Sequence, residues 1–165
     1  MGFELTTVSA ERTDELIVLR MAYLEADFGE LAPDDETAIR AALPNYFERH
    51  LGRDLFAFVA LAEDGTIASV ALLLVSEKPP NPRFPSGRIG TVFNVYTMPA
   101  YRRLGLASQV MAELVVYARE QDLDLVELNA TDEGYPLYRS LGFEDAVLHR
   151  PMSIAPKTSQ LGLDC

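Results

Sequence analysis

The sequence predicts an α/β fold with a central mixed β-sheet flanked by helices, and three observations support this prediction. The hydrophobic residues first recur at helical spacing and then, from residue 55, form near-continuous runs of strand length. An Asp64-Gly65 pair joins two of these runs, which is typical of an antiparallel hairpin. Farther along, a helical segment connects two short β-branched runs, and such a crossover pairs its strands in parallel.

A single domain is expected over residues 1–150, followed by a C-terminal tail over residues 151–165 with weak periodicity. The chain has 165 residues, 48% of them hydrophobic, which suits one sizeable core and is short for two domains. Lys and Arg number 14 against 25 for Asp and Glu, giving a net charge of -11. This charge argues against a nucleic-acid partner, because phosphate contacts need surplus cations. An acidic surface instead suits solubility or a cationic substrate.

Three features favour the cytoplasm. The single cysteine, Cys165, is the last residue, so no disulfide can form within the chain. Residues 1–10 lack the basic flank and apolar run of a signal peptide. The longest apolar run, over residues 67–75, is far shorter than the roughly 20 residues that a membrane span needs. We therefore expect a cytoplasmic protein with no membrane partner.

The first fifty residues predict one strand and two helical regions. Residues 3–8 have the β-branched bias of a strand, and residues 11–26 carry apolar side chains at helical spacing up to a closing glycine, Gly29. An acidic connection follows over residues 27–36. The second helical region begins at Pro33 and runs to about residue 51, but it contains Pro44, which removes a backbone donor. Two short helices and one longer helix fit this region equally.

The middle of the chain predicts strands. Residues 55–62 and 66–75 form the hairpin, and their near-continuous hydrophobicity predicts a sheet covered on both faces. Residues 77–87 contain four of the ten prolines and form an irregular loop. This loop leads to a strand over residues 89–97.

The last third predicts alternating helices and strands. Helical spacing covers residues 107–120, and a short strand follows over residues 124–130. A short helix is expected over residues 133–141, ending at Gly142, and a final strand over residues 143–149.

The stretch from Thr91 to Ala107 is the candidate anion site. It contains a β-branched and aromatic strand, a stop at Pro99, two arginines at positions 102 and 103, and Gly105 where a helix opens. Backbone N–H groups converge at such a turn, and the helix dipole favours negative charge there. The sequence thus predicts a site for a phosphate.

Two motifs resemble those of the GCN5-related N-acetyltransferase superfamily. Arg102-Arg103-Leu104-Gly105-Leu106-Ala107 is similar to its Arg/Gln-x-x-Gly-x-Gly/Ala acyl-CoA signature, preceded by a matching strand. Leu137-Tyr138-x-x-Leu141-Gly142-Phe143 is similar to its late helix-to-strand motif. The resemblance implies a mostly antiparallel sheet whose one parallel strand pair splays apart at the acyl-CoA site.

The resemblance also implies acetyl-CoA as the acyl donor. The N–H groups of residues 103–107, with Ser108 close by, would cradle the pyrophosphate, and the main chain at Val95 and Thr97 would bond the pantetheine arm. Many relatives have an asparagine that contacts the cofactor where this chain has Thr131. No metal is expected, because no His or carboxylate pair has ligand spacing. The implied cofactor-binding residues are Val95, Tyr96, Thr97, Arg102, Arg103, Leu104, Gly105, Leu106, Ala107, Ser108 and Thr131.

The chemistry needs a neutral amine, a stabilised oxyanion and a protonated leaving thiolate. The resemblance implies Tyr138 as the acid and a backbone N–H near Val95 for the oxyanion. Several family members use a strand glutamate as base, but residues 89–97 carry no carboxylate. The proton of the amine could instead pass to bulk solvent, to a water held by a polar side chain, or to an acidic residue before the second helical region. The candidate substrate-side residues are Asn94, Glu25, Glu30 and Asn129.

The predicted function is transfer of an acetyl group from acetyl-CoA to a primary amine by direct attack in a ternary complex. The acidic connection over residues 27–36 favours a small cationic amine, and a peptide N-terminus is the other acceptor considered. The alternative is a catalytically weak or silent acyl-CoA-binding regulatory domain. A homodimer is common in the family, although no interface can be read from the sequence.

Overall fold

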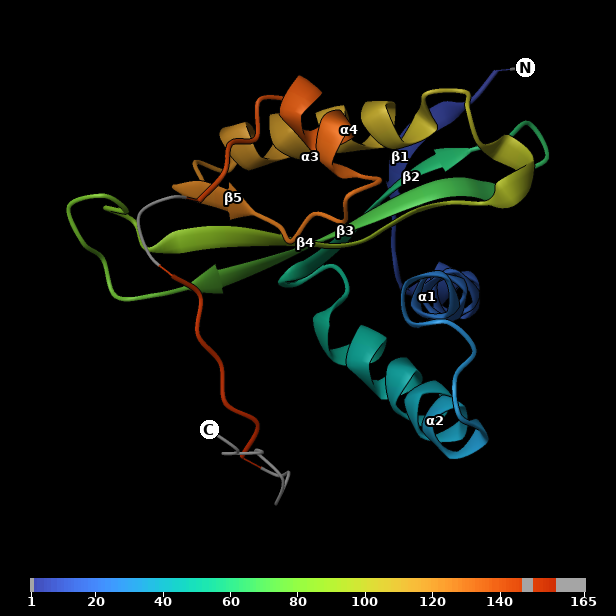
Figure 1. Ribbon diagram of the computed structural model, residues 1–165. Helices are drawn as coiled ribbons and strands as arrows, with labels where there is room; N and C mark the ends of the chain where they lie inside the picture. Colours follow the sequence, from blue (N-terminus) through green and yellow to red (C-terminus); the bar gives the residue numbers. More distant parts are fainter. Residues whose placement is uncertain (1, 147–149, 157–165) are drawn as a thin grey trace.

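The computed structural model describes residues 2–146 and 150–156 as a sheet with helices on both faces (Figure 1). The strands are β1 (Glu4–Val8), β2 (Leu55–Leu61), β3 (Ile67–Glu77), β4 (Arg88–Thr97) and β5 (Leu125–Glu127). The α-helices are α1 (Thr13–Phe28), α2 (Pro33–His50), α3 (Leu106–Glu120) and α4 (Tyr135–Ser140). Two 3-10 turns, η1 (Ala10–Arg12) and η2 (Pro99–Tyr101), precede α1 and α3.

The five strands lie in sequence order, β1-β2-β3-β4-β5. Neighbours from β1 to β4 are antiparallel, whereas β4 and β5 are parallel. Helices α1 and α2 lie on one side of the sheet and α3 and α4 on the other (Figure 1). The predicted mixed, mostly antiparallel sheet flanked by helices is therefore confirmed.

Each face of the sheet has its own hydrophobic core. On one face Leu16, Leu19 and Phe47 from α1 and α2 pack with the strands, and on the other face the α3 residues Met111 and Leu114 do so. All five are nearly inaccessible to solvent. Burying each such side chain contributes roughly 1.5 to 3 kcal/mol. The continuous apolar strands are explained by this double cover, as the sequence predicted.

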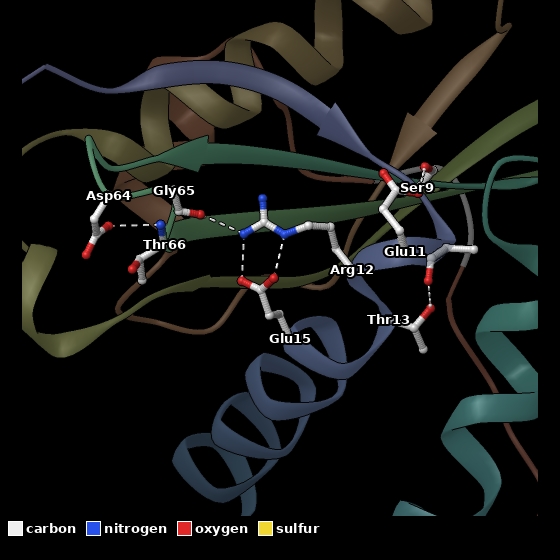
Figure 2. A network of polar contacts seen from close by, with 9 residues as sticks. Ser9, Glu11, Arg12, Thr13, Glu15, Asp64, Gly65 and Thr66 are labelled. Carbon is white, nitrogen blue, oxygen red and sulfur yellow. Dashed lines mark hydrogen bonds and ion pairs between the residues drawn. The ribbon is translucent and has the colours of Figure 1, made fainter.

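The start of α1 is fixed to the β2–β3 turn by Arg12 (Figure 2). Its Nη2 donates to the carbonyl oxygen of Gly65 at 2.6 Å and to Glu15 Oε2 at 2.6 Å. At the same turn, the backbone N–H of Thr66 donates to Asp64 Oδ1 at 2.9 Å. A hairpin turn and a helix far apart in sequence are thus joined, which sets where α1 crosses the sheet.

Helix α2 differs from one alternative that the sequence left open, since it continues through Pro44 as one helix. A proline inside a helix leaves the carbonyl of the residue four positions earlier, here Arg40, without its hydrogen bond. Both residues are exposed, so water can satisfy that carbonyl. Leu43 and Phe47 are buried on either side of the proline and hold the helix against the sheet.

The C-terminal region departs most from the prediction. Strand β5 is shorter than expected, and the strand predicted over residues 143–149 is wrong for residues 143–146, which form no strand. Glu144, Asp145 and Ala146 are exposed there, so no burial stabilises an extended pairing. Residues 147–149 lie outside the described residues. Residues 150–156 of the tail are exposed and irregular, and residues 157–165 are not described.

Candidate active site

The turn before α3 has the backbone geometry of an anion site. Arg103 and Gly105 both have positive φ, at 63° and 74°, and α3 begins at the next residue, Leu106. In the described part of the chain the N–H groups of residues 103–105 donate to no backbone carbonyl. The first N–H groups of any α-helix also lack partners within the helix. The turn therefore presents a run of unused donors at the positive end of the α3 dipole.

The two arginines of the turn have different environments. Arg102 folds back on β4, where its Nε donates to the carbonyl oxygen of Thr97 at 3.1 Å and its Cζ lies 5.6 Å from the ring centroid of Tyr96. Arg103 is exposed and has no side-chain partner among the described residues. Arg103 is therefore the free cation of the pair, whereas Arg102 braces the turn against the strand.

The parallel strands part next to this turn. Pairing of β4 with β5 covers only Ile89 to Thr91, opposite Leu125 to Glu127, while β4 continues to Thr97. The register between β3 and β4 also shifts beyond Phe93, and Asn94 there has a φ of 53°. A bulge of this kind bends a strand and re-aims its side chains. The described structure thus contains the splayed parallel pair that the resemblance implied.

Beyond the bulge, β4 turns its side chains to different faces. Val95 packs with the α3 core and Tyr96 with the α1 and α2 core. The hydroxyls of Thr97 and the fully buried Ser69 lie 2.8 Å apart. Because the Thr97 side chain is engaged within the sheet, any part it has in cofactor binding falls to its main chain.

Tyr138 on α4 is half-buried and its hydroxyl has no hydrogen-bond partner among the described residues. Its ring meets Phe143 edge-on, with centroids 6.0 Å apart. Gly134 makes room for the ring, since a Cβ at that position would lie 3.0 Å from Tyr138 Cε2. Burial, and to a lesser degree the nearby Tyr23, raise the pKa of Tyr138 above its ordinary 10.0. The phenol stays protonated at neutral pH and can donate a proton.

Residues of α1 join the site from the other side of the sheet, and sequence reasoning missed them. Arg20 Nη1 donates to Asn94 Oδ1 at 3.4 Å, and Arg20 Cζ lies 5.7 Å from the ring centroid of Tyr23. Burial and Asp27 raise the pKa of Tyr23, and Arg20 lowers it. A signal was present: Arg20 lies four residues after Leu16 and three before Tyr23, within the apolar stripe of the helix.

The other candidate residues make no described contact with Tyr138 or Asn94. Glu25 and Glu30 are exposed, and no described contact joins either to Tyr138 or Asn94. Thr131 Oγ1 accepts from the N–H of Gly134 at 3.1 Å, so this hydroxyl serves the start of α4. Asn129 is exposed just after β5. The roles proposed for these residues stay predictions.

A hollow of about 810 Å³ lies along β5 and α4, on the edge of the sheet. Its lining includes Asn129 and Tyr138, together with Arg83 and Arg139, but none of residues 102–107. The hollow is therefore distinct from the phosphate-type turn, and of the candidate site residues it includes Asn129 and Tyr138. The backbone donors of the turn, which suit the charge of a pyrophosphate, lie outside the hollow.

Within residues 2–146 and 150–156, no three His, Cys, Asp or Glu side chains come close enough together to bind a metal ion. None of the helices in that part of the chain combines the length and apolarity required to cross a bilayer.

A five-stranded mixed sheet that parts between its parallel strands, beside an open helix-start turn, is the architecture that the motifs led us to expect of an acetyltransferase. The chain belongs to the acetyltransferase (GNAT) family, whose model matches residues 18–143. The resemblance stated from the two motifs is thereby confirmed. Among the curated proteins, none matches this chain.

Solved structures share the fold. A predicted acetyltransferase from Clostridium acetobutylicum with acetyl-CoA is 23% identical, with a TM-score of 0.77, covering 92% of this chain and 96% of that chain. A GCN5-related N-acetyltransferase from Ralstonia eutropha is also 23% identical, with a TM-score of 0.73 and coverage of 92% and 99%. Glucosamine-6-phosphate N-acetyltransferase from Arabidopsis thaliana is 16% identical, with a TM-score of 0.63 and coverage of 94% and 100%. At these identities the likeness concerns the fold.

Proposed function

We propose that this protein transfers an acetyl group from acetyl-CoA to a primary amine, by direct attack within a ternary complex. The observation that supports it most is the parting of β4 from β5 beside a turn where the N–H groups of residues 103–105 have no acceptor among the described residues. Family membership supports an acetyltransferase. The acyl-CoA dependence, the amine and the residue roles below belong to the proposal.

The donor side follows from the backbone. The N–H groups of residues 103–107 bind the pyrophosphate, with Ser108 close by and Arg103 adding a free positive charge. Small residues, Gly105 and Ala107, leave room for the phosphates. The main chain from Val95 to Thr97 bonds the pantetheine arm where β5 no longer pairs with β4. The Clostridium relative in complex with acetyl-CoA supports this donor.

In this proposal two groups of the chain take part in the reaction: the Tyr138 hydroxyl and a backbone N–H of β4. Acetyl-CoA supplies a thioester whose carbonyl carbon the neutral amine attacks, so that a C–N bond forms as the C–S bond breaks. Tyr138 donates its phenolic proton to the leaving sulfur, and its raised pKa keeps that proton available. The N–H of Val95 or of a neighbouring residue donates to the developing oxyanion. The proton lost by the amine passes to water, directly or by way of Glu25, Glu30 or a water held by Asn129 or Asn94, and water returns one to Tyr138.

The acceptor is a small cationic amine or a peptide N-terminus. Acidic side chains crowd the α1–α2 connection, where Asp27, Glu30, Asp34 and Asp35 are exposed. Together with the net charge of -11, they attract an ammonium group toward this end of α1. In this proposal the enzyme works in the cytoplasm as one domain over residues 1–150, as a monomer or homodimer, and without nucleic acid.

A silent acyl-CoA-binding regulatory domain is the second candidate. One observation favours it: residues 89–97 of β4 carry no carboxylate that could take the proton of the amine. The free hydroxyl of Tyr138 weighs against it, because a binding module has no need of an acid at the thioester. Turnover separates the two candidates.

The test is a thiol-release assay with acetyl-CoA across classes of amine, run beside thermal-shift measurements with CoA alone. Release of free thiol that depends on an amine, together with an acetylated product seen by mass spectrometry, supports the enzyme. A thermal shift with CoA and no turnover with any amine supports the silent domain. No shift with CoA would overturn both.

A further inference from the structure

Arg20 is a half-buried cation without an acidic partner. Its guanidinium makes one long hydrogen bond, 3.4 Å to Asn94 Oδ1, and lies over the ring of Tyr23. Among the described residues the ion pairs of arginine involve Arg12 and Arg40, and Arg20 makes none. Among the described residues, no carboxylate oxygen therefore lies within 4.0 Å of this guanidinium.

The guanidinium reaches toward the sheet, where its hydrogen-bond partner Asn94 lies. Asn94 is only 3% exposed and lies on the β4 bulge, on the strand that carries the donor side of the site. Tyr46 of α2 also lies near Arg20: burial and Asp54 raise the pKa of Tyr46, and Arg20 lowers it. Groups from α1, α2 and β4 thus converge on one arginine.

A charge in such a place costs free energy unless an opposite charge compensates it. A guanidinium has five N–H donors in a planar fork that matches carboxylate or phosphate oxygens. One contact to a neutral amide leaves most of that capacity unused. Arg12, by comparison, donates to a carboxylate through two nitrogens. Most N–H donors of Arg20 thus have no acceptor among the described residues, and an anion could accept from them.

The position of Arg20 places these unused donors on the side of the sheet where the amine substrate is proposed to bind. Arg20 reaches Asn94 on the β4 bulge, where β4 no longer pairs with β5, and Tyr23, one turn along α1, raises the pKa of Tyr138 on α4. The pyrophosphate turn lies before α3, on the other face of the sheet (Figure 1). An anion bound at Arg20 is therefore on the acceptor side.

We propose that Arg20 binds an anionic group, a carboxylate or a phosphate, of the amine that this enzyme acetylates. The inference rests on the proposed function and deepens it. The exposed carboxylates of the α1–α2 connection attract the ammonium end of the acceptor, and Arg20 fixes its anionic end. The substrate class is accordingly an amine of both charges, such as an amino acid, a short peptide with a free carboxylate, or an amino-sugar phosphate.

The experiment compares matched pairs of amines that differ only in the anion: an amino acid with its amide, and glucosamine 6-phosphate with glucosamine. In one of the two pairs, the parent protein should use the anionic amine with a kcat/KM about 10-fold or more above that of the neutral amine. A preference in the first pair indicates a carboxylate as the bound group, and a preference in the second pair indicates a phosphate. Arg20→Gln should remove the preference, while changing the neutral member less than about 3-fold. Arg20→Lys keeps the positive charge but loses the planar guanidinium, so its preference for the anionic amine should lie between those of the parent and of Arg20→Gln.

The control is Arg40→Gln, which removes an equal charge from the exposed face of α2 and should leave both members unchanged. CoA-induced thermal shift shows that each variant is folded and binds the donor. Calorimetry of the same amines with the CoA-bound protein gives a second readout that needs no turnover. Equal use and equal binding of charged and neutral members by the parent would overturn the inference, as would equal losses for both in Arg20→Gln. A parent that acetylates nothing yet binds the anionic members through Arg20 contradicts the proposed function alone.

Discussion

Nη1 of Arg20 on α1 lies 3.4 Å from Oδ1 of Asn94 on β4, although the two residues are 74 positions apart. Asn94 reaches this position because the β4 bulge turns its backbone to a φ of 53°, which asparagine tolerates better than most residues. The contact joins α1 to β4, the strand that leads into the turn proposed to bind the cofactor. It is the one described hydrogen bond of the Arg20 side chain.

Asn94→Asp should turn this contact into an ion pair. The new carboxylate would satisfy Arg20 from within the protein, so an anionic acceptor would have to compete with it. We expect kcat/KM for anionic amines to fall by about 10-fold, with the CoA-induced thermal shift unchanged. Steady-state kinetics with the matched pairs measure this. Asn94→Gly is the control, because glycine keeps the backbone geometry and leaves Arg20 open; a loss in Asn94→Gly equal to that in Asn94→Asp would contradict the explanation.

Tyr138→Phe should lower kcat by about 100-fold and leave the KM for acetyl-CoA nearly unchanged, since only the proton donor is removed. Single-turnover or steady-state thiol release measures this. Tyr135→Phe on the same helix is the matched control, because that exposed hydroxyl donates to Asp145 Oδ2 and not to the site. Similar losses in both variants would show that Tyr138 is not the acid.

The pH dependence of kcat follows from the same residue. Burial raises the pKa of Tyr138 above 10.0, so the acid form is complete throughout the neutral range. The contribution of Tyr138 to kcat should persist to pH 9 and be lost as the pH rises through the raised pKa. The ratio of parent to Tyr138→Phe activity, measured from pH 7 to 10.5, should stay constant and then decline. A ratio that declines between pH 7 and 8 would exclude this assignment.

Gly105→Glu should abolish thermal stabilisation by CoA. The added carboxylate lies where the pyrophosphate is proposed to bind, and the φ of 74° adds backbone strain of roughly 1 to 2 kcal/mol. Gly52→Glu is a matched control, since Gly52 has a φ of 79° with nothing within 4 Å and lies after α2. Both variants should lose similar stability in urea, and Gly52→Glu should keep its response to CoA. An unaltered response in Gly105→Glu would refute the proposed cofactor turn.

Arg12→Ala should destabilise the fold by about 1 kcal/mol, because it removes the bonds to Glu15 and to the Gly65 carbonyl that join α1 to the hairpin turn. Arg40→Ala removes only an exposed helix pair with Glu36 and should cost less than about 0.5 kcal/mol. Urea unfolding at low salt compares the two. Equal losses would mean that the contact with Gly65 contributes nothing beyond a surface ion pair.

The elements that sequence reasoning predicted well are those with a strong local pattern. The Asp64-Gly65 hairpin and the α3 repeat are confirmed because turn chemistry and apolar spacing act within a few residues. The sequence pattern around Pro44 fitted one helix and two helices equally. The structure has one helix, which the burial of Leu43 and Phe47 holds against the sheet. The strand predicted over residues 143–149 is wrong over its first four positions, which pair with no strand, and residues 144–146 are exposed.

The sequence by itself determined the family and led to the proposal of the donor turn, because both depend on contiguous motifs whose backbone preferences are local. Only the tertiary structure decided how the two arginines of that turn differ, with Arg102 held on β4 and Arg103 left free. It also decided that Arg20 and Asn94 meet, since that meeting depends on a strand bulge and on where α1 crosses the sheet. Whether side chains of two distant elements meet is set by how those elements pack, and spacing within one element does not encode it.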